Sequence, residues 1–210
     1  MFDISTLAIY MTAVTILLIT PGPAVLYVVA RSIDQGARAG IISTMGISVG
    51  TLVHVAGAAL GISAILVTSA VAFNVVKYLG AAYLIYLGIR KFLENESFQS
   101  NQQQNGNSSQ SFYRGIIVSL FNPKSALFFL AFLPQFVDVS NGSPAIQMLV
   151  LGAIFVVMGI VNDSLYALLA GKIGGWLKSN LSFIRAQKYF SGSVYIALGI
   201  ATALSGSEKK

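Results

Sequence analysis

Long apolar stretches separated by short polar segments dominate this chain. Positions 39–76 contain no Lys, Arg, Asp or Glu, which is too long for one bilayer-spanning helix of about 20 residues and fits two. The whole pattern predicts six membrane-spanning helices. The predicted spans are 5–30, 39–66, 72–92, 115–136, 145–171 and 189–204.

The composition agrees with a membrane protein. Of 210 residues, 55% are hydrophobic and only 10% are charged, against about 25% charged in soluble domains. Alternating segments typical of membrane β-barrels are absent, so the class is all-α. A removable signal peptide is not expected, because no basic segment and no cleavage pattern precede Pro21. The chain has no cysteine, which excludes disulfides and thiolate metal sites.

The basic residues predict the orientation in the membrane. Connections after spans one, three and five hold Arg31, Arg38, Arg90, Lys91, Arg114, Lys172, Lys178, Arg185 and Lys188. The other side holds Lys77, Lys209 and Lys210. The positive-inside rule therefore places both termini on the periplasmic or extracellular side. The net charge of +6 is assigned to this topology and not to nucleic-acid binding.

The two halves of the chain resemble each other. MGISVGTL at 45–52 recurs as MGIVNDSL at 158–165, and KYLGAAYLIYLGI at 77–89 as KYFSGSVYIALGI at 188–200. Three spans per half is an odd number, so the second half is expected to be inverted, an architecture common in secondary transporters. The predicted organisation is a first repeat at 1–93, a polar cytoplasmic linker at 94–112, a second repeat at 113–205 and a tail at 206–210.

Each half carries prolines inside its first span. The interrupting residues are Thr20, Pro21, Gly22 and Pro23 in the first half, and Asn122, Pro123 and Lys124 in the second. Proline costs about 3 kcal/mol in a helix interior. Thr20 and Asn122 are suitable N-caps, so each break is expected to start a half-helix whose N–H groups could bind a carboxylate. The alternative is a proline kink that serves packing only.

Two charged residues are predicted near mid-span. A central Lys124 costs about 2.5 to 3.5 kcal/mol on insertion scales, so either it has a function or its side chain reaches an interface. Asp163 could bind an ammonium group or carry a proton, and its alternative is a structural ion pair with Lys124. Lys77 is expected nearer the outer interface, as an anchor.

GISVG at 46–50 matches the G-x-S-x-G pattern of serine hydrolases, and the single histidine, His54, follows closely. The context is a membrane helix without the required strand and turn. Gly46 and Gly50 also form a GxxxG close-packing pattern. We therefore predict no enzyme. His54 either packs and bonds between helices, or lines the pathway and relays protons.

Four blocks in order resemble the LysE/RhtB amino-acid exporters: 20–40, 46–61, 79–89 and 122–136. The resemblance covers most of the chain. It implies an inner-membrane efflux carrier for amino acids such as homoserine, threonine, lysine or leucine, driven by the proton gradient. It also places the family's PGP motif on Pro21 to Pro23, its NPK motif on Asn122 to Lys124, and its fifth-span acid on Asp163.

One position departs from the family. Many relatives carry an acid just after the glycine in the second span, where this chain has Thr51. A neutral amino acid is therefore favoured over a lysine-type substrate, with Asp163 as the candidate for proton coupling.

The partners expected are an amino acid, protons and the lipid bilayer, without cofactor, metal or nucleic acid. Glycine-rich faces permit close helix contacts within one chain or in a homo-oligomer. The alternatives are an exporter of an inorganic cation or other small metabolite, and a membrane scaffold or receptor.

Overall fold

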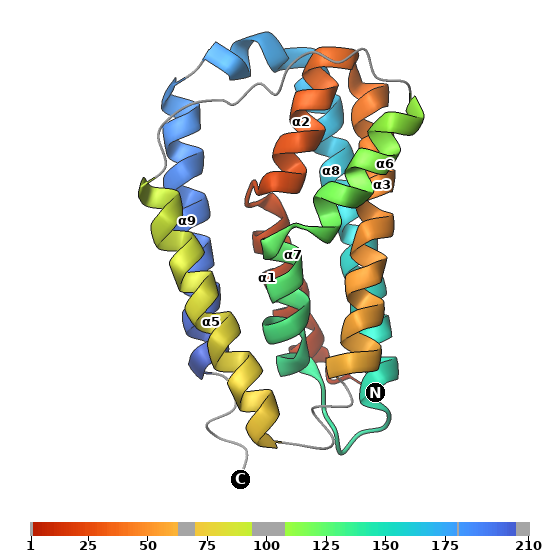
Figure 1. The fold of residues 1–210 in the computed structure, drawn as a ribbon, viewed down its shortest axis with the longest axis vertical. Helices are drawn as coiled ribbons and strands as arrows, with labels where there is room; N and C mark the ends of the chain where they lie inside the picture. The colour runs from red at the N-terminus through yellow and green to blue at the C-terminus, as the bar shows by residue number, and fades with distance from the viewer. Residues whose placement is uncertain (1, 63–69, 94–107, 180, 205–210) are drawn as a thin grey trace.

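The computed structural model describes residues 2–62, 70–93, 108–179 and 181–204, and these residues form helices and connections without strands (Figure 1). The all-α prediction is confirmed for this part of the chain. The elements are α1 (Ile4–Ile19), α2 (Pro23–Gln35), α3 (Ala37–Gly57), the π-helical turn η1 (Ala58–Ile62), α5 (Ala70–Leu93), α6 (Ser108–Leu120), α7 (Pro123–Leu127), the π-helical turn η2 (Phe128–Phe132), the 3-10 turn η3 (Leu133–Phe136), α8 (Pro144–Ser179) and α9 (Leu181–Leu204).

Two to four of the described segments are long and apolar enough to cross a membrane. Ala37–Ile62 and Pro144–Lys172 qualify alone. Ile4–Ile19 with Pro23–Gln35, bent by 49°, and Ser108–Leu120 with Pro123–Phe136, bent by 46°, each add a span if the pair counts as one. These four coincide with predicted spans one, two, four and five, while α5 and α9 cover spans three and six. The six-span inverted repeat stays a prediction.

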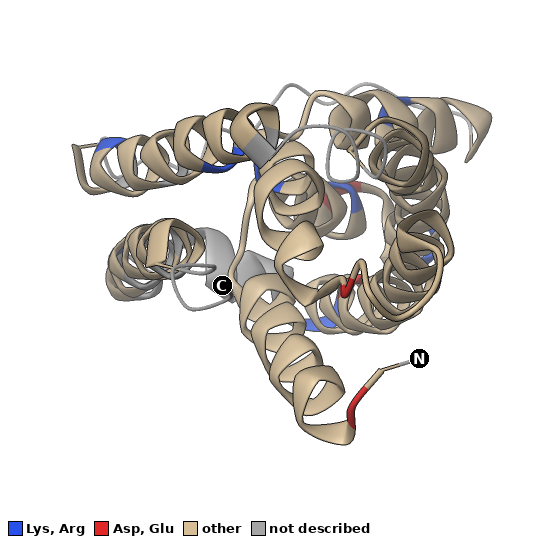
Figure 2. Cartoon of the chain, turned by 90° about the horizontal axis from the view of Figure 1, so that it is seen from below, with Lys and Arg blue, Asp and Glu red and all other residues tan. Residues whose placement is uncertain are grey.

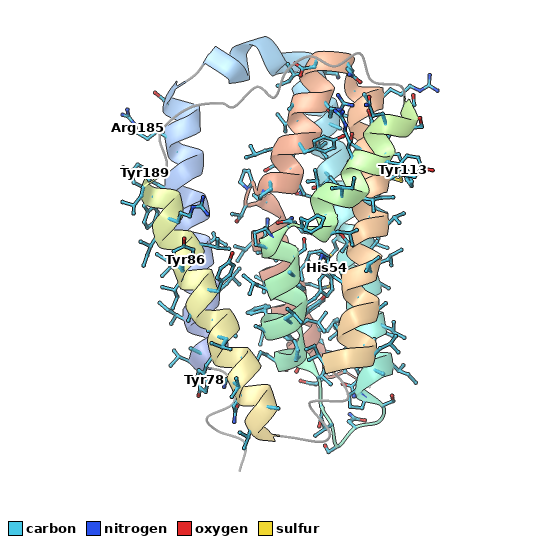
Figure 3. All side chains as sticks on the ribbon, in the orientation of Figure 1. His54, Tyr78, Tyr86, Tyr113, Arg185 and Tyr189 are labelled. Carbon is cyan, nitrogen blue, oxygen red and sulfur yellow. The ribbon has the colours of Figure 1, made fainter. Side chains whose placement is uncertain are left out.

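The helices form a main bundle and a separate pair. In the bundle, α2 and α3 each pack against α6 and α8 and against each other. The pair consists of α5 and α9, which pack side by side, and α5 touches the bundle mainly at η2 (Figure 1). Tyr78, Tyr86 and Tyr189 are exposed side chains of this pair (Figure 3). Charged residues are sparse along the helices (Figure 2).

Glycines allow α3 and α6 to approach closely. A Cβ added at Gly46 would lie 2.0 Å from the Phe112 carbonyl oxygen, and one at Gly50 would lie 2.6 Å from the Cβ of Ser119. The close-packing interpretation of GISVG is confirmed. Ser48 instead donates to the Thr44 carbonyl within its own helix, at 2.9 Å.

The last residues of the predicted linker, 108–112, are helical. Residues 94–107 lie outside the described part of the chain, but Ser108 already begins α6. Ser111 is buried, accepts from the Arg31 guanidinium at 3.1 Å through its hydroxyl, and accepts from the Tyr27 hydroxyl through its carbonyl at 3.2 Å. The polar end of this stretch therefore packs on α2.

An apolar cluster fills the end of the bundle that holds Tyr10, η1 and η2. Phe128 and Phe155 lie with ring centroids 4.7 Å apart, and the Tyr10 hydroxyl donates to the Leu151 carbonyl at 2.7 Å. Lys77, expected as an interfacial anchor, is buried instead, with its ammonium 4.5 Å from the Tyr78 ring centroid.

Candidate substrate site

The first break separates α1 from α2. Helix α1 ends at Ile19, Thr20 is its C-cap, and α2 starts at Pro23 with Gly22 as its N-cap. The prediction that Thr20 is an N-cap is therefore wrong. Its hydroxyl donates back to the Ile16 carbonyl at 2.7 Å, a local bond that serine and threonine readily make.

The second break separates α6 from α7. Helix α6 ends at Leu120, and the Asn122 side chain accepts from the backbone N–H of Lys124 at 3.1 Å. Pro123 occupies the first helical position, where its missing N–H costs nothing. The predicted N-cap at Asn122 is confirmed.

Side chains from the second half of the chain bind the carbonyl end of α1. The Lys124 ammonium donates to the Leu17 and Thr20 carbonyls at 2.5 and 2.6 Å. The Asn162 amide donates to the Leu18 carbonyl at 3.1 Å, and the Tyr166 hydroxyl to the Ile19 carbonyl at 2.8 Å. The break in the first half is thus stabilised by α7 and α8.

A pocket lies where the two breaks meet α3 and α8, with an empty volume of about 490 Å³ including its open mouth. Its lining is Leu18, Gly22, Ala24, Val25, Ile47, Ser48, Thr51, Asn122, Lys124, Ser125, Phe155, Val156, Gly159 and Asp163. Four of the predicted site residues belong to it: Gly22, Asn122, Lys124 and Asp163. Thr20, Pro21, Pro23 and Pro123 shape the breaks without lining this pocket.

The pocket wall carries one buried charge of each sign. Lys124 is 6% exposed and Asp163 is 5% exposed. The Lys124 ammonium hydrogen-bonds to backbone carbonyls, whereas the Asp163 carboxylate accepts from the Asn162 amide at 3.0 Å. The hydrogen bonds of these two side chains therefore go to different partners, and the structural ion pair considered above stays an alternative.

Comparison with known proteins identifies the family. The family model for LysE type translocators matches residues 15–206. This chain belongs to the LysE type translocator family. A homoserine/homoserine lactone efflux protein of Salmonella typhimurium is 32% identical over 195 residues, covering 92% of this chain and 94% of the relative. The corresponding Salmonella typhi protein is 31% identical with the same coverage.

A membrane protein of Bacillus subtilis, YrhP, is 29% identical over 210 residues, covering 95% of this chain and 99% of the relative. No solved structure matches. The family match confirms the LysE resemblance predicted from the four blocks. Because the members of this family are transporters, the general function of this chain is export of a small molecule across a membrane.

In this LysE type translocator, His54 lies outside the pocket lining. Its Nε2 lies 3.0 Å from the Ser119 carbonyl oxygen, and its ring stacks on Phe129 with centroids 6.2 Å apart (Figure 3). The sequence allowed two roles for His54, a bond between helices or a place on the transport pathway. This contact is a bond between helices. Ser48 and His54 have separate partners, so they form no hydrolase dyad.

Asn162 and Tyr166 were not predicted as site residues of this translocator. They are four positions apart on α8 and so share one helix face, the face that meets the end of α1. Two polar residues on one helix face, next to Asp163, are a sequence pattern from which these two site residues could have been predicted. Among the described residues, no group of three or more His, Asp or Glu is placed to hold a metal ion.

Proposed function

We propose that this translocator exports neutral amino acids of the homoserine, threonine or leucine kind across the inner membrane, in exchange for protons. The observation that carries the proposal is the pocket bounded by both helix breaks and by one buried charge of each sign. A zwitterion in a dry cavity needs both charges matched. The family match and the two relatives named for homoserine and homoserine lactone efflux support it.

The substrate carboxylate is assigned to the start of α2. The first α2 bond in the i to i−4 pattern runs from the Leu26 N–H to the Gly22 carbonyl at 2.9 Å. The N–H groups of Ala24 and Val25 precede it and therefore have no helical acceptor, and both residues line the pocket. The positive end of the helix dipole favours an anion there. The Lys124 ammonium has three N–H donors. Two of them bind the Leu17 and Thr20 carbonyls, and the third is assigned to the substrate carboxylate.

The second break contributes differently from our expectation. Asn122 already accepts from the Lys124 N–H, and α7 is only five residues long. The carboxylate role at the NPK motif therefore falls to the Lys124 side chain.

The substrate ammonium is assigned to Asp163, which exchanges it for a proton during the cycle. Apart from the Asn122 amide, the rest of the lining is apolar or hydroxylic, including Ile47, Phe155 and Thr51, and this suits a side chain without charge. In this proposal six spans form two inverted repeats that rock about the pocket, with both termini outside the cytoplasm.

The test uses protein reconstituted in vesicles with an imposed proton gradient and two radiolabelled substrates, homoserine and homoserine lactone. Both have an amino group, but the lactone lacks a free carboxylate. Asp163→Asn should lower uptake of both at least tenfold. Lys124→Gln should lower homoserine transport more than lactone transport.

Matched controls are Asp34→Asn and Arg38→Gln, which likewise replace one acidic and one basic side chain by a neutral amide, at exposed positions outside the pocket lining. Undiminished transport by the Asp163 variant would remove Asp163 from the mechanism. Counterflow of inorganic cations without amino-acid counterflow would favour the alternative exporter, and no counterflow at all would favour a scaffold or receptor.

A further inference from the structure

The carbonyl end of α1 lacks the backbone donors that usually follow a helix. Pro21 and Pro23 have no N–H, so the Leu17 and Ile19 carbonyls lose their usual helical donors, and among the described backbone bonds at this break none ends on the carbonyls of Leu17 to Thr20. In a membrane interior an unsatisfied carbonyl is costly. All the side-chain donors described for these four carbonyls come from the second half of the chain.

The donors divide into two kinds. Asn162 and Tyr166 are neutral, and each serves one carbonyl, at 3.1 and 2.8 Å. The Lys124 ammonium serves the two flanking carbonyls, Leu17 and Thr20, at 2.5 and 2.6 Å. A hydrogen bond from a charged donor is stronger than one between neutral groups.

The surroundings favour a cation at this point. A helix C-terminus carries a partial negative charge from its aligned carbonyls, and Lys124 is buried. Its ammonium lies on these carbonyls instead of on the carboxylate of Asp163, although both residues line the same pocket. Carbonyls at broken helices are known in transporters as cation ligands.

We infer that the Leu17 and Thr20 carbonyls form a binding site for a primary ammonium group, which the chain fills with its own Lys124. Lys124 is then a positioning residue for α1 as well as part of the pocket wall. A carboxylate in the pocket that binds the third N–H pulls on the ammonium that serves the carbonyl pair, so pocket occupancy is linked to the position of α1. This last consequence rests on the proposed function, whereas the ammonium site does not.

The ammonium site is tested by removing the Lys124 side chain and adding a small ammonium compound in its place. Lys124→Ala removes Cγ, Cδ, Cε and Nζ, a fragment the size of n-propylammonium. Addition of n-propylammonium chloride to the purified variant in detergent should raise its thermal midpoint saturably by about 2 to 4 °C. Wild-type protein, whose site is filled, should show no saturable rise.

Two controls separate hydrogen bonding from charge and from volume. Tetramethylammonium has the same charge but no N–H, and Lys124→Met fills the space with an apolar chain of similar length. Neither tetramethylammonium on Lys124→Ala nor n-propylammonium on Lys124→Met should give the rise. An equal rise in either control, or none with n-propylammonium on Lys124→Ala, would overturn the inference.

A second variant covers the case in which Lys124→Ala does not fold. The chain has no cysteine, so Lys124→Cys can be modified selectively with 2-aminoethyl methanethiosulfonate, which attaches a chain ending in an ammonium. The neutral methyl reagent is the control. Recovery of the thermal midpoint with the aminoethyl reagent alone supports the site, and equal recovery with both reagents contradicts it.

Transport measured on the same samples separates this inference from the proposed function. Thermal recovery in a protein whose wild type moves no amino acid would support the ammonium site and refute the proposed function. Transport by the wild type with no ammonium-specific recovery in either variant would support the proposed function and refute the ammonium site.

Discussion

His54 on α3 bonds through Nε2 to the carbonyl of Ser119, next to the last residue of α6, at 3.0 Å. Because a carbonyl only accepts, this ring nitrogen is the donor. The same relationship holds at the other break, where Asn162 and Tyr166 of α8 donate to the last carbonyls of α1. Each broken helix is therefore stabilised at its carbonyl end by a helix of the other half: α6 by α3, and α1 by α8.

The first prediction concerns His54. His54→Ala should lower the free energy of unfolding by about 0.5 to 1.5 kcal/mol, since the Ser119 carbonyl loses one of two donors and keeps the Asn122 backbone N–H at 3.0 Å. His54→Gln, which retains an N–H donor, should restore most of this loss. The measurement is thermal or denaturant unfolding of the purified protein in detergent.

Ser48→Ala is the stability control on the same helix, because the Ser48 hydroxyl donates only to a carbonyl of its own helix. Transport by His54→Gln with an unchanged dependence on external pH would exclude a proton relay through His54. Full stability with lost transport in the same variant would contradict the packing role.

The contact between α3 and α6 gives the second prediction. Gly46→Ala should destabilise the protein by about 1 to 3 kcal/mol, because the new Cβ would meet the backbone carbonyl of Phe112 at 2.0 Å. Backbone cannot move aside as a flexible side chain can. Unfolding in detergent measures the effect.

Gly57→Ala is the matched control, at the end of the same helix and with nothing within 4 Å of its added Cβ. It should be neutral or stabilising by up to about 1 kcal/mol, the difference in helix propensity between glycine and alanine. Equal destabilisation by both substitutions would show that the α3 and α6 contact is looser than the structure has it.

The sequence predicted those features that depend on a residue's own chemistry. Proline lacks an N–H, so the two breaks could be located, and Asn122 before Pro123 could be identified as a cap. Gly46 and Gly50 share one helix face, so close packing there was foreseeable. These properties are local and need no knowledge of the neighbouring helix.

Features that depend on tertiary partners were missed. Thr20 has two local choices, capping the next helix or bonding back to Ile16, and the sequence does not decide between them. The carbonyl partners of Lys124 come from a segment more than 100 positions away. Helix α8 continues to Ser179, beyond the predicted limit of 171, because a helix does not have to end where its apolar run ends.

The third prediction concerns Thr51, which lines the pocket at the position where the family resemblance expects an acid. Its hydroxyl donates to the Ile47 carbonyl at 2.9 Å and lies 3.1 Å from the Ser119 hydroxyl. Thr51→Asp adds a second negative charge to the pocket beside Asp163, so cationic side chains gain an attraction of about 1 to 2 kcal/mol at an effective dielectric constant near 20. The ratio of lysine to homoserine transport should therefore rise by roughly tenfold.

Thr51→Asn is the control, because asparagine has the same shape as aspartate without the charge. It should leave the ratio of lysine to homoserine transport within about twofold. A comparable shift in both variants would make the effect steric, and no shift in Thr51→Asp would place the substrate side chain away from α3.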